Sequence, residues 1–228
     1  MDAESDTFAA SKGVEIIIGK KADFMMKGKI QTSDLLKAVV DKKNGLGKSR
    51  IMSHVSILEI PTYHKILAVS DGGMVICPSL EEKKQILENT LEVFLSLGYE
   101  NPKVAVLAAI EKVNPKMKET LDGEALKNMY INKEIENCII EGPISYDLAI
   151  SMESANIKGY KSPVAGDADI LLAPDITTGN ILSKSLVYSG KARMAGFIIG
   201  AKVPIALTSR GASSEQKYLS LVICSAMF

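Results

Sequence analysis

The chain has 228 residues, which is enough for one large α/β domain or two smaller lobes with a substantial core. Lysine plus arginine and aspartate plus glutamate number 27 each, so the formal net charge is zero, and this balance without a dense basic run argues against general nucleic-acid binding. No apolar run reaches transmembrane length, the N-terminus has no signal-peptide pattern, and three widely spaced cysteines suit a reducing compartment, so we expect a cytoplasmic protein that does not bind membranes.

The first part of the chain contains a short strand, a basic glycine turn and a helix start. Residues 22–26 are mostly apolar and predict the strand, which is closed by Lys27-Gly28-Lys29. Thr32-Ser33-Asp34 offers N-caps for a helix that runs to about residue 43. Helix N-terminal amides and the helix dipole favour negative charge, so this pattern can form an anion site. An ordinary connection between a strand and a helix would look the same.

Strands and helices alternate through the middle of the chain. Strands are expected at residues 52–59, 65–69, 103–109 and 138–141. A capping box of Ser79 and Glu82 predicts a long helix over residues 80–97, and shorter helices are expected at residues 122–130 and from Ser145 onward. This alternation is typical of a parallel or mostly parallel α/β fold.

One stretch, from Ser162 to Asn180, combines a loop, a buried strand, a second loop and a helix start. Residues 168–173 are mostly apolar and suit a strand buried on both faces, which Pro174 ends. Asp175, Thr177 and Thr178 offer caps for a helix from about Asn180 to Tyr188. Ligands of open α/β sheets bind beyond the carboxyl ends of strands, so we expect the turn at residues 174–180 to face a cleft.

Small, hydroxylated or charged residues follow several of the predicted strands. Two apolar strands, at residues 196–199 and 204–207, lead into Thr208-Ser209-Arg210-Gly211, and Ser213 or Ser214 caps a terminal helix. A serine hydroxyl can donate to a developing oxyanion, and an adjacent guanidinium can bind phosphate through two hydrogen bonds. A strand end with a surface arginine is the ordinary alternative. The other such strand ends are Lys27-Gly28, Asp71-Gly72-Gly73, Glu141-Gly142-Pro143 and residues 175–180.

Other kinds of site find little support in the residue pattern. The two histidines, His54 and His64, have no metal-like partner spacing, so each is interpreted as a core or surface residue, and no metal is expected. The chain has neither a Gly-x-Ser-x-Gly elbow nor a Gly-x-Gly-x-x-Gly turn. A nucleophile-elbow hydrolase and a dinucleotide-dependent dehydrogenase are therefore weak interpretations.

Motifs in unbroken order over nearly the whole chain carry a family resemblance. They are the SPVAGDAD run at residues 162–169, Pro174-Asp175 with Gly179-Asn180, Thr208-Ser209-Arg210-Gly211, and residues 26–28, 101–105, 113–117, 184–188 and 199–204. Together they resemble the phosphate acetyl/butyryltransferase family, and most closely its phosphate butyryltransferase branch.

The resemblance implies an α/β fold of two lobes, with mostly parallel sheets flanked by helices and an active cleft between the lobes, as in isocitrate dehydrogenase. The first lobe would comprise residues 1–56 and 201–228, and residues 57–200 would form an inserted second lobe. Family members usually form homodimers, so a homodimer is expected here.

The resemblance also implies transfer of a short or branched acyl group between coenzyme A and inorganic phosphate, with butyryl-coenzyme A as the model substrate. Coenzyme A would be a substrate, and no bound cofactor is expected. Ser209 and Arg210 match the family residues that act on the acyl phosphate. Phosphate binding falls, by the same resemblance, to Lys27, Thr32 and Lys37, and Gly28, Asp175, Gly179 and Asn180 are further candidates for substrate binding because they lie in the polar segments after predicted strands.

Three features depart from the family pattern. Gln216 stands where the acetyl branch places an aspartate that is thought to deprotonate the coenzyme A thiol; the adjacent Glu215 is the candidate catalytic base, although one helical step turns a side chain by about 100°. Lys37 stands where arginine is common, and the chain begins within what resembles a first-lobe helix. Phosphate acetyltransferase, a relative that forms long-chain acyl phosphates, and a catalytically weak protein that binds coenzyme A or phosphate are therefore kept as alternatives.

Overall fold

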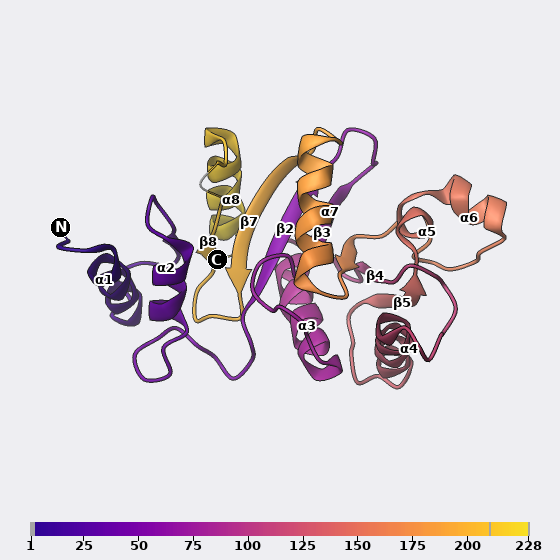
Figure 1. Ribbon diagram of the computed structural model, residues 1–228, viewed down its shortest axis with the longest axis horizontal. Coiled ribbons are helices and arrows are strands. Elements are labelled where there is room, and N and C mark those ends of the chain that lie inside the picture. Colours follow the sequence, from indigo (N-terminus) through magenta and orange to yellow (C-terminus); the bar gives the residue numbers. More distant parts are fainter. Residues whose placement is uncertain (1–2, 210, 228) are drawn as a thin grey trace.

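A computed structural model describes residues 3–209 and 211–227 (Figure 1). Its strands are β1 (Met25–Met26), β2 (Ser53–Glu59), β3 (Ile66–Ser70), β4 (Lys103–Leu107), β5 (Ile139–Ile144), β6 (Ile170–Leu172), β7 (Arg193–Ile199) and β8 (Ile205–Ala206). Its helices are α1 (Asp6–Ile18), α2 (Thr32–Val39), α3 (Leu80–Ser96), α4 (Lys118–Ile131), α5 (Tyr146–Ile150), α6 (Met152–Lys158), α7 (Ile176–Tyr188) and α8 (Ser214–Ala226).

The strands form one mixed sheet in the order β1-β8-β7-β2-β3-β6-β4-β5. The pairs β1–β8, β3–β6, β6–β4 and β4–β5 are parallel, whereas β8–β7, β7–β2 and β2–β3 are antiparallel. The predicted α/β class with a mostly parallel sheet is confirmed. The strand direction reverses from β2 to β3, because residues 60–65 are too few for a crossover connection and join the two strands as a hairpin.

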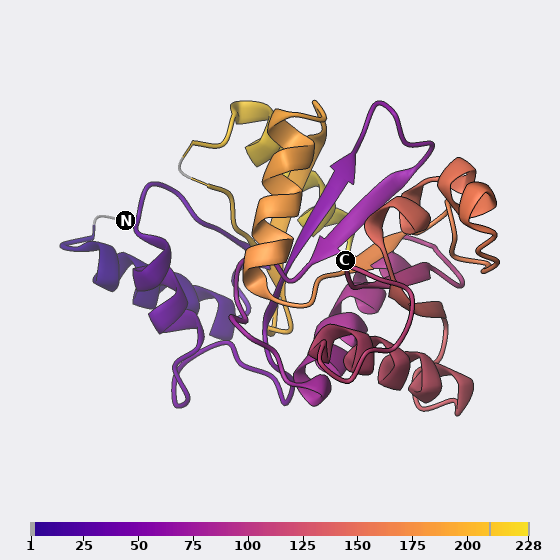
Figure 2. The ribbon, with the colours of Figure 1, turned by 45° about the vertical axis from the view of Figure 1, so that its right-hand side comes forward.

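Helices cover both faces of the sheet (Figures 1 and 2). On one face α3, α4 and α8 pack against inward side chains such as Val55 and Phe197. On the other face α5, α6 and α7 cover Leu58 and Leu67, while α1 and α2 cover the β7–β8 end around Ile198. One continuous sheet therefore joins the two segments that the resemblance assigns to separate lobes, and the lobe boundaries themselves stay a prediction.

The predicted helix starts are partly right. Ser79 with Glu82 forms the predicted capping box at α3. At α8 Ser213, one of the two predicted caps, forms a capping box with Gln216. Asp175 caps α7 by accepting from the Thr178 N–H at 2.8 Å, so α7 begins at Ile176, earlier than predicted. At α2 the prediction is wrong: the N-cap is Gln31 without a side-chain cap, and the helix ends at Val39.

The β5 strand corrects another prediction. Gly142-Pro143 was expected to close the strand, but β5 continues through this pair to Ile144. Because β5 is the last strand of the sheet order, Pro143 can lack an N–H donor on the open side without breaking a ladder. Glu141-Gly142-Pro143 is thus a part of a strand and not a polar segment beyond one.

Candidate functional site

The first candidate site lies beyond the carboxyl ends of β1 and β8. These strands are parallel neighbours, in register from Met25 opposite Ile205, so the segments that follow them meet. The Lys27 N–H extends the ladder by donating to the Ala206 carbonyl at 3.0 Å. The two segments and α8 enclose a cavity of about 400 Å³, here called the β1–β8 pocket, lined by Met26, Lys27, Gly28, Lys29, Thr208, Ser209 and Lys217.

The β1–β8 pocket is rich in positive charge and hydroxyl groups. Lys27 is 3% exposed, and its Nζ donates to the carbonyls of Gly28 and Ile30, each at 3.3 Å. Ser209 is exposed, and its Oγ accepts from the Gly211 N–H at 3.3 Å. Among the described residues, the pocket lining includes three lysines and no acidic residue, so its chemistry suits an anionic ligand.

Three other residues, Arg210, Thr32 and Lys37, are predicted to act at this pocket. Arg210 lies outside the described residues. Thr32 is half-buried at the first position of α2, and Lys37 is exposed in the last turn of that helix; neither lines the pocket.

The predicted base is not brought to the pocket. The Glu215 carboxylate accepts from the Arg193 Nε at 2.7 Å, and Arg193 also pairs with Glu59 at 2.7 Å. Gln216 is occupied in the α8 capping box, where its Oε1 accepts from the Ser213 N–H at 3.2 Å. The Ser209 hydroxyl and the Glu215 carboxylate are therefore not joined into one catalytic group.

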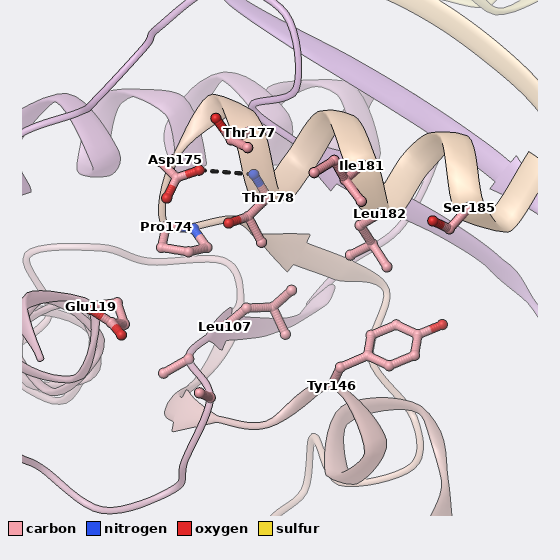
Figure 3. A pocket seen from close by; sticks show the side chains of 12 residues that line it. Leu107, Glu119, Tyr146, Pro174, Asp175, Thr177, Thr178, Ile181, Leu182 and Ser185 are labelled. Carbon is pink, nitrogen blue, oxygen red and sulfur yellow. Dashed lines mark hydrogen bonds between the residues drawn. The ribbon is translucent and has the colours of Figure 1, made fainter.

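A second and larger cavity, of about 610 Å³, lies between α7, α5 and the carboxyl end of β4; we call it the α7 cavity (Figure 3). Figure 3 shows Asp175 at the start of α7 and Tyr146 across the cavity from Leu182. Most of the lining is apolar. The lining residues are Leu107, Ala108, Ala109, Glu119, Tyr146, Pro174, Asp175, Thr177, Thr178, Ile181, Leu182 and Ser185.

Gly179 and Asn180 hold α7 against the loop that follows β3. A Cβ on Gly179 would lie 2.2 Å from the Asp71 carbonyl oxygen, so only glycine allows this approach of the two backbones. The Asn180 side chain donates to the Gly72 carbonyl at 2.9 Å. The Asp71 carboxylate in turn accepts from the N–H groups of residues 73–75 at 2.6–3.1 Å. Gly179 and Asn180 therefore hold the backbone of α7 against the backbone that follows β3, and this contact is here called the seam. Neither Gly179 nor Asn180 lines the α7 cavity.

The two groups of strand ends point in opposite directions. Antiparallel pairing from β8 to β7, from β7 to β2 and from β2 to β3 makes β8 run opposite to β3 and to its parallel partner β6. Ser209 follows β8, whereas Asp71 and Asp175 follow β3 and β6. The sequence interpretation treated all strand ends as one group, because the hairpin at β2 was not recognised.

His54, which the residue pattern did not single out, lies between these groups. Its ring touches Gly73, after β3, and Gly196 in β7, where an added Cβ would lie 3.0 Å from Cγ and 3.2 Å from Nε2, respectively. Its Nδ1 is buried without a hydrogen-bond partner among the described residues. Burial lowers the pKa of His54, against the opposing effects of Asp71 and of a hydrogen bond to the Leu207 carbonyl. The alternation of residues along β2 predicts the face of the sheet on which His54 lies. No pattern near His54 predicts that Gly73 and Gly196 lie beside its ring.

The acidic residues of the SPVAGDAD motif have a structural role at the amino ends of the strands. Asp169 accepts from the Lys103 N–H at 2.7 Å and pairs with Lys65 at 2.9 Å. Asp167 pairs with Lys65 and His64, both at 2.8 Å, and with Lys103. Burial alone would raise the pKa of Asp167, but hydrogen bonds from Lys103, Lys65 and His64 outweigh it and hold that pKa far below its ordinary value.

Residues 3–209 and 211–227 were searched for metal-binding groups and for membrane-spanning helices. Within them no group of three or more histidine, cysteine, aspartate or glutamate side chains is placed to hold a metal ion. Within the same ranges, none of the helices combines the length and apolar character needed to cross a bilayer.

Comparison with known proteins identifies the family. The fold and the β1–β8 pocket define an α/β protein with a cationic, serine-containing site. The family model described as "Phosphate acetyl/butaryl transferase" matches residues 5–225. The chain therefore belongs to the phosphate acetyl/butyryltransferase family, whose members are acyltransferases.

Individual relatives agree with this assignment. A probable phosphate butyryltransferase of Bacillus subtilis is 47% identical over 219 residues, which cover 95% of this chain and 73% of the relative. A phosphate acetyltransferase of Thermotoga maritima is 46% identical over 220 residues, covering 96% and 74%. The crystal structure of a branched-chain phosphotransacylase from Enterococcus faecalis V583 superposes with a TM-score of 0.92 at 36% identity, covering 100% of this chain and 81% of that one.

Proposed function

We propose that the protein transfers a short or branched acyl group between coenzyme A and inorganic phosphate. The observation that carries the proposal is the β1–β8 pocket, in which Ser209 and three lysines face one cavity within a chain of this family. The substrates are then an acyl-coenzyme A and phosphate, and the products are an acyl phosphate and free coenzyme A.

The chemistry requires an anion site and a donor for a developing oxyanion. A phosphate oxygen attacks the thioester carbonyl carbon, a C–O bond forms, and the C–S bond breaks as the sulfur leaves and takes up a proton. In the reverse direction the coenzyme A thiol, whose reference pKa is about 8.5, must lose its proton before it attacks. Negative charge grows on the carbonyl oxygen in both directions.

Residues of the β1–β8 pocket fit these two needs. The ammonium groups of Lys27 and Lys217 attract the phosphate, and the Ser209 hydroxyl donates to the carbonyl oxygen as it becomes negative. Arg210, next in sequence, is proposed to bind the transferred phosphate. For Glu215 to act as the base, its carboxylate would first have to leave the ion pair with Arg193.

The acyl-coenzyme A needs a longer and less polar contact surface than phosphate does. The thioester itself must reach Ser209, so we infer that an apolar part of the coenzyme A moiety away from the thioester lies over the α7 cavity, which has the volume of an ordinary small-molecule site and the apolar side chains Leu107, Ile181 and Leu182. Asp175 at the rim would then face polar groups of the same substrate.

Two further proposals concern the location and the oligomeric state of the protein. We propose a cytoplasmic location: Cys77, Cys138 and Cys224 are all free thiols, and burial raises the pKa of the latter two to about 12. We also propose a homodimer, the state that the family resemblance implies. Cell fractionation and light scattering of the purified protein test these two points.

A thiol-release assay tests the function. The purified protein is mixed with phosphate and with acetyl-, butyryl- or branched acyl-coenzyme A, and free thiol is measured. Phosphate-dependent release with a four-carbon or branched chain is expected to exceed release with acetyl-coenzyme A. Faster release with acetyl-coenzyme A would favour phosphate acetyltransferase, and turnover only of acyl-carrier-protein thioesters would favour the long-chain relative. Calorimetric binding of coenzyme A without turnover would indicate a binding protein and contradict the proposal.

A further inference from the structure

The lining of the β1–β8 pocket contains one wholly hydrophobic side chain among the residues that the structure describes. This side chain belongs to Met26, at the end of β1, and the other lining residues are three lysines, a glycine, a threonine and Ser209. Met26 is half-buried and packs against the hydrophobic core on the α8 face of the sheet. The cationic pocket therefore has one apolar wall, and Met26 forms it.

The alternation of side chains along β1 decides which of its two methionines reaches the pocket. Met26 packs against the core cluster that includes Cys224 of α8. Met25 packs on the opposite face with α1 and α2, where its Cε lies 3.2 Å from a Cβ built on Gly13. Met25 is not among the described residues that line the pocket. Two adjacent methionines thus differ in that one contributes to the pocket and the other to the core beneath α1.

The pocket has space for a short chain beside this apolar wall. Gly28 also lines the pocket and adds no side chain to it, and a Cβ built there would meet nothing within 4 Å. The cavity volume of about 400 Å³ is near the lower end of the range of ligand sites, which is about 300–1,000 Å³. Such a volume suits phosphate together with a short acyl chain and does not suit a long one.

The acyl chain of the proposed substrate has to lie in this pocket. The Ser209 hydroxyl is proposed to donate to the thioester carbonyl oxygen, and the acyl chain is bonded to the same carbonyl carbon. Methylene groups gain from leaving water for contact with an apolar side chain, whereas the strongly hydrated ammonium groups of the lysines offer no such contact. Methionine is unbranched and flexible, so its side chain can pack against straight and branched chains. Met26 is therefore the lining residue best suited to contact the acyl chain.

We propose that Met26 is a specificity-determining residue: its side chain contacts the acyl chain of the thioester in the β1–β8 pocket and sets the chain length that the protein accepts. This inference rests on the function proposed for the pocket. It assigns two parts of one substrate to different places, with the acyl chain beside Met26 and an apolar part of the coenzyme A moiety at the α7 cavity.

Three variants test the role of Met26. Met26→Gln keeps the length of the side chain but makes its end polar, Met26→Ala shortens it, and Met25→Ala is the matched control on the opposite face of the same strand. Thiol release gives kcat/KM with acetyl-, butyryl- and hexanoyl-coenzyme A. Met26→Gln is expected to lower the butyryl-to-acetyl ratio of kcat/KM by at least about 10-fold, because one methylene in an apolar pocket changes kcat/KM by about 10- to 200-fold. Met26→Ala is expected to raise the hexanoyl-to-butyryl ratio by a similar factor, and Met25→Ala should leave both ratios unchanged.

Two results of this experiment would overturn the proposal. One is that Met26→Gln keeps the butyryl-to-acetyl ratio of wild type while its fold is intact by circular dichroism. The other is that Met25→Ala changes the ratios as much as the Met26 variants do, because the effect would then come from the strand and not from the pocket. Met26→Gln nearly preserves side-chain volume, so it decides the question if Met26→Ala does not fold.

Calorimetry separates this inference from the proposed function. Wild type is expected to bind butyryl-coenzyme A more tightly than acetyl-coenzyme A, and Met26→Gln is expected to remove the difference between the two Kd values. If wild type binds in this way but releases no thiol, the proposed acyl transfer fails and the contact of Met26 with the acyl chain stands. If wild type releases no thiol and binds the two thioesters equally, both proposals are overturned.

Discussion

The β1–β8 pocket and the α7 cavity differ in charge, in size and in the direction of the strands that lead to them. The first is about 400 Å³ and lined by lysines and hydroxyl groups; the second is about 610 Å³ and mostly apolar. Among the residues that the structure describes, the two share no lining residue. One molecule thus offers an anion site and an apolar site, which are the two kinds of surface that phosphate and acyl-coenzyme A need.

The difference also explains why some predicted site residues line neither cavity. Gly179 and Asn180 connect α7 to the segment after β3, and the His54 ring lies between Gly73 of that segment and Gly196 of β7. These residues hold the elements that carry the two sites. Substitutions in the lining should therefore alter catalysis, and substitutions in the connecting seam should mainly alter stability.

The largest effect on catalysis is expected for Ser209→Ala. Removing one donor to an oxyanion typically lowers kcat by about 100- to 1,000-fold. The hydroxyl is exposed and makes few contacts, so the melting temperature should stay near that of wild type. Thiol release and thermal unfolding measure the two quantities, and a rate equal to that of wild type would remove Ser209 from the site.

The largest effect on stability is expected for Gly179→Ala. The new Cβ would lie 2.2 Å from the Asp71 carbonyl oxygen, so α7 has to move, at a cost of about 3 kcal/mol in the free energy of unfolding. Gly28→Ala is the matched control, because a Cβ there meets nothing within 4 Å. Urea unfolding compares the two. Similar stabilities would mean that the close approach of the seam is not required.

A smaller effect is expected for Asp175→Ala. Loss of the cap on α7 leaves the Thr178 N–H without its 2.8 Å acceptor and should cost about 1 kcal/mol. Asp175→Asn keeps a capping oxygen and should recover most of this stability, whatever it does to catalysis. If Asp175→Asn does not recover this stability, the loss comes from the missing charge and not from the missing cap.

The smallest effect is expected from the ion pairs at the amino ends of the strands. The pKa of Asp167 is lowered in the folded chain, so this group stabilises the fold above its unfolded pKa of about 3.9 and loses that contribution as pH falls toward the folded pKa. Asp167→Asn should therefore be less stable than wild type at pH 7, and the difference should shrink in acid. A difference that grows on acidification would contradict the assigned sign.

The sequence predicts the elements better than it predicts how they meet. Capping boxes at Ser79 and Ser213 are local patterns, and both helix starts are confirmed. The antiparallel hairpin of β2 with β3 divides the predicted strand ends into two groups. The short link between the two strands indicates this hairpin, but the strand-end argument did not take the link into account. The environment of His54 depends on Gly73 and Gly196, which are distant in sequence and were not connected with it.

In the candidate site, too, the sequence predicts only some of the side-chain contacts. Lys27 and Ser209 follow parallel neighbouring strands, so the resemblance and the pairing agree in bringing them together. Glu215 is one helical step from Gln216, but its ion pair with Arg193 joins α8 to β7 and depends on a residue 22 positions away. Such long-range pairs are decided by packing and not by motif spacing.

Saturation kinetics of two variants test the central claim, that phosphate is bound in the β1–β8 pocket and an apolar part of the coenzyme A moiety over the α7 cavity. Lys27→Met should raise the KM for phosphate by about 10- to 100-fold, the value of a hydrogen bond to a charged group, and leave the KM for butyryl-coenzyme A nearly unchanged. Ile181→Glu, on the 60% exposed apolar rim, should do the reverse. An unchanged KM for phosphate in Lys27→Met, with its fold intact by circular dichroism, would contradict the account.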